Sequence, residues 1–184
     1  MSRRALLLLA LMGLIARPAG AAPTRVPVAN GGFEEGLAGW SAIKPGGFGH
    51  GELALTAAEV HSGKSAVHFA NVAEGEKVLV GLTHGRMIPI PDSSRTFRLT
   101  VWIKANKAPK VMELRIASAD RQGKSLSPWQ EKGWRFIRPP VEPHVGQWHQ
   151  AVAEFAAQPE WGGIYLTVWI NGAGADVLVD DIAL

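Results

Sequence analysis

The sequence predicts an all-β fold, a sandwich or jelly roll of antiparallel strands. Many short stretches alternate apolar and polar residues with a period of two, as strands with one buried face do. Glycine and proline separate these stretches at short intervals, and none of them has a sustained helical period. We find no internal repeat and no linker, so we expect one domain over residues 22–184.

The N-terminus has the pattern of a cleavable signal peptide over residues 1–21. Arg3 and Arg4 precede an apolar segment, residues 5–16, that is too short for a stop-transfer helix. Residues 19–21 (Ala-Gly-Ala) supply the small side chains of a cleavage site. We therefore expect a secreted or periplasmic protein.

The charge balance argues against nucleic acid and anionic membranes as partners. Three of the 19 Lys and Arg residues lie in residues 1–21, which contain no acid. The remaining chain therefore has 16 basic and 16 acidic residues, which leaves no net positive charge to attract phosphates. Because the sequence contains no cysteine, an exported domain must be stabilised by its core or by a bound metal.

Alternation predicts the individual strands before the C-terminal segment. The clearest places Phe97, Leu99, Val101 and Ile103 on one side of an extended chain. Residues 41–51 are predicted as a loop, and residues 125–144 as a long irregular segment. The six predicted strands are Glu52–Thr56, Ser65–Phe69, Lys77–Thr83, Phe97–Ala105, Val111–Ala117 and Trp148–Phe155.

Residues 164–184 are predicted to form a hairpin. Its first half alternates strictly between an aliphatic side and a side of aromatic and polar residues. Residues 171–174 (Asn-Gly-Ala-Gly) favour a turn, because glycine adopts positive φ readily. The return strand contains two adjacent acids, Asp180 and Asp181, in an otherwise apolar run.

Aromatic and polar residues on the faces opposite the aliphatic core are the candidate carbohydrate-binding residues. Sugar rings stack on indole and phenol rings, while polar side chains bond the hydroxyl groups. The long segment 125–144 could line a cleft with two further tryptophans. Burial under loops is the competing interpretation for the two tryptophans on strands. The candidates are Trp102, Trp169, Tyr165, Thr167, Glu113, Arg115, Trp129 and Trp134, whereas Trp40, Trp148 and Trp161 are assigned to packing.

Two carboxylates occupy positions that are unusual for acids. Glu34 lies in a glycine-rich turn and Asp180 in an apolar strand. Ca²⁺ binds six to eight oxygens from carboxylates and backbone carbonyls, and would explain both. The alternative for Asp180 and Asp181 is that one is solvated and the other accepts a hydrogen bond from a loop amide.

Five motifs, in order, resemble carbohydrate-binding modules of the family 4/9/22 type, which belong to the galactose-binding-like β-sandwich group. The motifs are residues 30–36 with Gly39-Trp40, residues 61–66, residues 97–105, residues 146–148 and residues 179–184. The resemblance covers almost the whole mature chain. It implies a jelly-roll sandwich of two antiparallel sheets with a structural calcium. Carried over by motif, the calcium ligands are the side chains of Glu34 and Asp180 and backbone oxygens near Gly32, His61 and Lys64.

The resemblance implies non-catalytic binding of a polysaccharide or oligosaccharide in a cleft on the concave sheet. Such modules are usually attached to a catalytic domain, so a separately encoded glycan-active enzyme is an expected partner. Sandwiches of this group also serve as protein-interaction modules in the cell envelope. A small glycoside hydrolase or lyase would need two opposed carboxylates, such as Glu113 and Glu131, but nothing in the sequence requires that arrangement.

Overall fold

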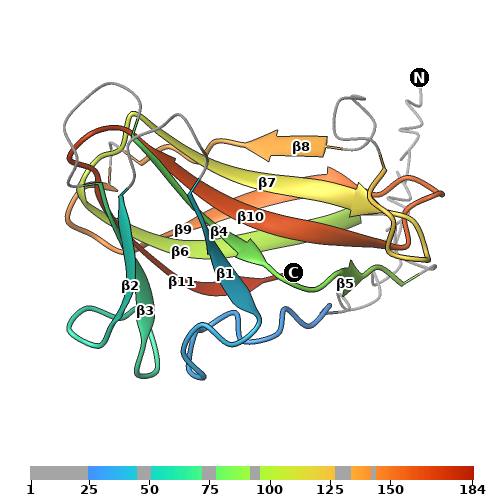
Figure 1. Cartoon of the computed structure of the whole chain (residues 1–184), viewed down its shortest axis with the longest axis horizontal. Helices are drawn as coiled ribbons and strands as arrows, with labels where there is room; N and C mark the ends of the chain where they lie inside the picture. The colour runs from blue at the N-terminus through green and yellow to red at the C-terminus, as the bar shows by residue number, and fades with distance from the viewer. Residues whose placement is uncertain (1–24, 45–50, 72–77, 92–95, 127–133, 142–143) are drawn as a thin grey trace, which may run out of the picture.

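Two antiparallel β-sheets lie face to face in the part of the chain that the structure describes (Figure 1). The structure is a computed structural model, and it describes residues 25–44, 51–71, 78–91, 96–126, 134–141 and 144–184. All regular elements in these ranges are strands, so the predicted all-β sandwich is confirmed. The proposed signal peptide, residues 1–21, and Trp129 lie outside the described residues.

The first sheet has the strand order β1-β4-β10-β7-β8, and β5 pairs with one end of β10. The longest pairing joins β10 to β7 in continuous register from Gly163 opposite Ala119 to Asn171 opposite Val111. The strands are β1 (Trp40–Ile43), β4 (Leu79–His84), β5 (Ile88–Pro89), β7 (Val111–Ala119), β8 (Trp134–Ile137) and β10 (Gly163–Asn171).

The second sheet has the strand order β2-β3-β11-β6-β9. Its central strand β11 pairs with β3 on one side and with β6 on the other, where the register shifts at two places. The strands are β2 (Glu52–Thr56), β3 (Ala66–Ala70), β6 (Thr96–Lys107), β9 (His149–Ala156) and β11 (Asp176–Ala183).

The core fills the space between the sheets with the aliphatic side of each alternating strand. In β6 the predicted inner residues Phe97, Leu99, Val101 and Ile103 are all buried. The first sheet contributes the even-numbered residues of β7 and β10, such as Leu114, Ile116, Leu166 and Val168. The odd-numbered residues of these two strands therefore face outward, away from the second sheet.

The prediction of a C-terminal hairpin is wrong, because β10 and β11 belong to different sheets. The turn residues bond other strand ends: Gly172 N–H donates to Val78 and Gly174 N–H donates to the Asn71 carbonyl. The buried Asn71 side chain also donates to the Gly172 carbonyl. The turn is thus a crossing between two facing sheets, which alternating sequence does not distinguish from a hairpin.

Two segments predicted as irregular contain strands. Residues 40–43 form β1, which pairs with β4, and Trp134–Ile137 forms β8, which pairs with β7. Both are four-residue strands at the edges of the first sheet. Such short edge strands gain their structure from a neighbour, so local alternation indicates them weakly. Within the described ranges, no helix is long and apolar enough to cross a bilayer.

Candidate functional site

The outer face of the first sheet brings together aromatic and charged side chains from three adjacent strands. Register places Trp169 of β10 opposite Glu113 of β7, and Arg115 of β7 opposite Phe136 of β8. Arg138 follows one residue after β8 and reaches the same carboxylate. We call these five residues (Glu113, Arg115, Phe136, Arg138 and Trp169) the Arg–Trp face.

Trp169 lies flat between a glycine and a guanidinium group. Its indole crosses Gly81 of β4, where an added Cβ would come within 2.8 Å of the ring. The Arg115 guanidinium carbon lies 4.9 Å from the Trp169 ring centroid and 5.6 Å from that of Phe136. These distances fit cation–π contacts with both rings. As a result, only 9% of the Trp169 surface is exposed.

Glu113 is a buried carboxylate shared by two arginines. Its side chain is 7% exposed, while those of Arg115 and Arg138 are 32% and 69% exposed. Arg115 Nε donates to Oε1, and Arg138 Nε donates to Oε2 at 3.1 Å. A buried carboxylate is costly unless it is paired, and the two arginines supply that pairing here.

A pocket of about 270 Å³ opens on this face. A second pocket of about 240 Å³ adjoins it and shares Val111 and Arg138 as lining residues. In the first pocket the Asn171 side chain has a buried Oδ1 without a hydrogen-bond partner. The first pocket is lined by Leu79, Val111, Glu113, Arg115, Arg138, Trp169 and Asn171, and the second adds Pro109, Lys110, Met112, Pro139, Pro140 and Val141.

Tyr165 and Thr167, two predicted binding residues, also point outward from β10 and form internal hydrogen bonds. The Tyr165 hydroxyl donates a hydrogen bond to the Gly123 carbonyl at 3.1 Å, which links β10 to the turn after β7. The Thr167 hydroxyl bonds Thr83 of β4 at 3.1 Å. Neither residue lines the two pockets described above, so their role as sugar ligands remains a prediction.

Trp102 lies on the second sheet and is separated from the Arg–Trp face. It belongs to β6, where the His61 ring stacks on it with centroids 3.6 Å apart and an angle of 15°. The Trp148 ring also contacts His61, with ring centroids 5.7 Å apart in an edge arrangement. Trp134 starts β8, where its backbone pairs with Ala117 of β7, and Trp129 is outside the described residues.

Three contributing residues were not among the sequence candidates: Phe136, Arg138 and Asn171. Phe136 and Arg138 fall in the segment predicted as irregular. The alternation of residues 134–138 (Trp-Arg-Phe-Ile-Arg) was a usable signal for a short strand with an aromatic and basic side. Asn171 continues the outward side of β10 and could have been added by the same period.

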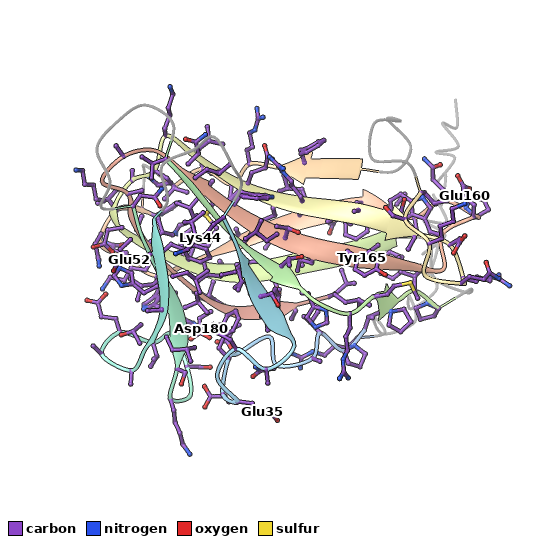
Figure 2. The ribbon with its side chains drawn as sticks, viewed as in Figure 1. Glu35, Lys44, Glu52, Glu160, Tyr165 and Asp180 are labelled. Carbon is purple, nitrogen blue, oxygen red and sulfur yellow. The ribbon has the colours of Figure 1, made fainter. Side chains whose placement is uncertain are left out.

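The two unusual carboxylates meet a single turn, residues 61–65, from different sides. Glu34 accepts hydrogen bonds from Lys64 N–H through both carboxylate oxygens, at 2.9 and 3.0 Å. Asp180 Oδ2 accepts from the amides of His61 and Ser62 at 3.0 and 3.2 Å. Asp180, labelled in Figure 2, belongs to β11 of the second sheet, whereas the Arg–Trp face lies on the first sheet, so this corner and the Arg–Trp face are distinct sites.

The corner offers ligands of the class that calcium prefers. Gly63 makes room for Glu34, since an added Cβ would clash with the Glu34 carboxylate. Carboxylate oxygens have more than one lone pair, so the amide bonds leave acceptor capacity for an ion. Among the described residues there is no group of three or more His, Asp or Glu suited to a metal. A calcium ion here would therefore depend on Glu34, Asp180 and backbone carbonyls.

Burial raises the pKa of Asp180 above its usual range. The amides of Ser62, Asp181 and His61 oppose this rise, and the neighbouring Asp181 carboxylate adds to it. Asp181 itself is partly exposed and accepts from His61 Nδ1 and the Ser62 hydroxyl. Asp180 therefore accepts hydrogen bonds from loop amides, and calcium at this corner remains a prediction.

The fold has counterparts among solved carbohydrate-binding structures. The module TmCBM61, in complex with β-1,4-galactotriose, has a TM-score of 0.54 and 20% identity, over 86% of this chain and 97% of the module. The xylan-binding CBM22-1 domain of Paenibacillus barcinonensis Xyn10C has a TM-score of 0.51 and 16% identity, over 83% and 88%. The chain has the β-sandwich fold of a carbohydrate-binding module. The predicted resemblance to these modules is therefore confirmed at the level of the fold.

Part of an enzyme domain also has this fold. The enzymatically active domain of tailspike protein 4 from bacteriophage CBA120 has a TM-score of 0.65 and 13% identity. The alignment covers 84% of this chain but 20% of the tailspike chain, so this chain spans about a fifth of that protein's length. No protein-family profile and no curated protein sequence matches the chain.

Proposed function

We propose that the protein is a non-catalytic, secreted or periplasmic carbohydrate-binding protein that recognises a polysaccharide or oligosaccharide on the Arg–Trp face. The observation that carries this proposal is the pocket on the outer face of the first sheet. It combines an indole, a buried carboxylate, two guanidinium groups and an unpaired carboxamide oxygen. A concave site with an aromatic lining and a small number of convergent polar groups is typical of ligand-binding sites.

Similar modules support the choice of ligand. The family 61 module was solved in complex with β-1,4-galactotriose and the CBM22-1 domain is a xylan-binding domain, and both share this fold over most of their length. A sugar in the present pocket would meet mainly hydrogen-bonding groups, because the Trp169 ring is largely covered.

The pocket favours binding over hydrolysis. Glycoside hydrolysis requires two carboxyl groups on opposite sides of the scissile bond. Glu113 is the acid among the described lining residues, and both of its oxygens are bonded to arginines. With both oxygens held by guanidinium groups, Glu113 has no free oxygen to direct at a glycosidic oxygen. Glu131, the second carboxylate considered from the sequence, is outside the described residues.

Affinity electrophoresis tests this function. Retardation in β-glucan, xylan, mannan or charged polysaccharide gels is expected, and Leu79→Trp should reduce it by filling the pocket. Leu55→Trp, on exposed β2 of the second sheet, is the matched control and should bind normally. Trp102→Ala is expected to leave binding unchanged, since Trp102 lies on the other sheet. Absence of retardation in all gels, including the envelope glycans of the source organism, would refute the proposal.

A protein partner is the alternative occupant of the same face. Phe136 is 56% exposed at the edge of the sheet, and exposed aromatic residues are enriched in protein interfaces. A stoichiometric partner whose capture is unaffected by sugars and lost with Phe136→Ala would favour this function.

We also propose that calcium stabilises the corner formed by Glu34 and Asp180. The supporting observation is that both carboxylates, 146 positions apart in the chain, meet the same turn. A bound ion would neutralise part of the acid charge there and tie the N-terminal turn to β11.

A further inference from the structure

We propose that the Arg–Trp face selects saccharides that carry an anionic substituent, such as a uronate carboxylate or a sulfate group. This inference rests on the proposed function, and it names the chemical class of the ligand. Three features of the face support it: the covered indole, the free edges of two guanidinium groups and the charge of the pocket lining.

The first feature is that Trp169 is not available as a platform for a neutral sugar ring. Gly81 lies against the indole, and the Arg115 guanidinium lies over it at 4.9 Å. A pyranose could stack on this ring only by displacing Arg115. Displacement would break the cation–π contact and the ion pair with Glu113. The surface that a ligand meets is therefore the guanidinium group itself.

The second feature is the way in which Glu113 holds the arginines. It accepts one Nε–H bond from Arg115 and one from Arg138. Among the residues that the structure describes, no acceptor is hydrogen-bonded to the Nη atoms of either arginine. Each guanidinium group carries five N–H donors, and within the described ranges only the Nε–H of each arginine is bonded. A planar edge with two parallel N–H groups matches a carboxylate or sulfate.

The third feature is an excess of positive charge in the two adjoining pockets. Their described lining contains three cations (Lys110, Arg115 and Arg138) and a single acid, Glu113. Glu113 offsets one of these three charges, so the described lining keeps an excess of two positive charges (3 − 1) to attract an anion. Arg138 is shared by both pockets and is 69% exposed, which places its charge where an entering ligand can reach it.

The experiment compares acidic and neutral polysaccharides by affinity electrophoresis. The acidic probes are polygalacturonate, alginate and chondroitin sulfate, and the neutral probes are β-glucan, mannan and unsubstituted xylan. We expect stronger retardation by at least one acidic probe, weakened as salt rises from 0.05 to about 0.5 M. Arg138→Gln should weaken this binding about tenfold or more, because a charge-assisted bond is lost.

The matched control is Arg98→Gln. Arg98 lies on β6 of the second sheet, is 67% exposed and also bonds a glutamate, Glu154. The Arg98→Gln substitution should leave binding unchanged. Arg138→Lys keeps the charge but loses the planar edge, so it should give an intermediate affinity. Thermal melts of all three variants verify that each one is folded.

The outcomes separate the two proposals. Retardation by neutral probes alone, unaffected by Arg138→Gln, would overturn anionic selection and leave carbohydrate binding intact. No retardation by any probe would refute both. Equal retardation by polyglutamate, a polymer without sugars, would also overturn the inference, because plain charge attraction would then explain the result.

Discussion

Glu113 is expected to stabilise the protein mainly through Arg115 and only weakly through Arg138. We expect Glu113→Gln to lower the free energy of unfolding by about 1–3 kcal/mol. Glutamine has nearly the same shape, but its NH₂ group faces one guanidinium group donor to donor. The loss stays below the 3–5 kcal/mol of a fully buried broken pair, since water can reach both arginines.

Exposure determines how the loss divides between the two arginines. The Arg138 side chain is 69% exposed, so solvent screens its pair with Glu113, and we expect a coupling below about 1 kcal/mol. The Arg115 side chain is 32% exposed and is also held between two aromatic rings. Its coupling to Glu113 should therefore be larger, on the order of 1–3 kcal/mol.

Double-mutant cycles measured by urea unfolding test this division. Glu113→Gln is combined with Arg115→Gln and, separately, with Arg138→Gln. Glu154→Gln, which breaks the exposed pair with Arg98, is the control and should cost less than about 1 kcal/mol. Equal or greater stability of Glu113→Gln, or a stronger coupling to Arg138 than to Arg115, would refute the reasoning.

Three further predictions concern calcium, pH and packing. If calcium binds only the folded state at Glu34 and Asp180, chelation with EDTA should lower the melting temperature by several degrees, and an unchanged melt would remove that site. Burial, and then the charge of His144, lowers the pKa of His149, and the backbone groups of Gln147 and Pro140 oppose this shift only in part. The unfolded state then binds the proton more tightly, so stability should fall as pH drops below about 6.5, and less so in His149→Gln. Gly81→Ala should displace the Trp169 ring and lower the free energy of unfolding by about 1–3 kcal/mol in urea unfolding, and an unchanged stability would contradict this packing argument.

The strands were predictable from the sequence because their alternation follows from burial of one face. The predicted Glu52–Thr56 coincides with β2, and the predicted Phe97–Ala105 lies inside β6. In both sheets the predicted aliphatic side forms the core. The sandwich therefore depends on local patterns that remain visible without a structure.

The assignment of strands to sheets was not predictable in the same way. Alternation shows that two neighbouring strands each have an apolar side, and this holds for a hairpin and for a crossing between facing sheets. The turn after β10 is fixed by Asn71 and Val78, which lie about a hundred positions earlier in the sequence. Such long-range hydrogen bonds leave no local signal in residues 171–175.

The candidate site shows the same limit at the level of single side chains. The period of β7 and β10 correctly places Glu113, Arg115 and Trp169 on outward faces, and the β7–β10 register makes them neighbours. The period cannot reveal that Trp102, with the same outward pattern, lies on the opposite side of the sandwich beneath His61.

The contact between Arg115 and Trp169 implies a different ligand from the one that the residue types alone would suggest. A tryptophan and an arginine on one face suggest that the ring stacks a sugar while the arginine bonds a hydroxyl group. In this structure Glu113 draws Arg115 across the indole, because a buried carboxylate must be paired. The ring then serves as a support that fixes the guanidinium plane, and Gly81 provides the space in which that support lies. Recognition shifts from an apolar surface to a fixed set of N–H donors, and the ligand that satisfies such donors best is an anion.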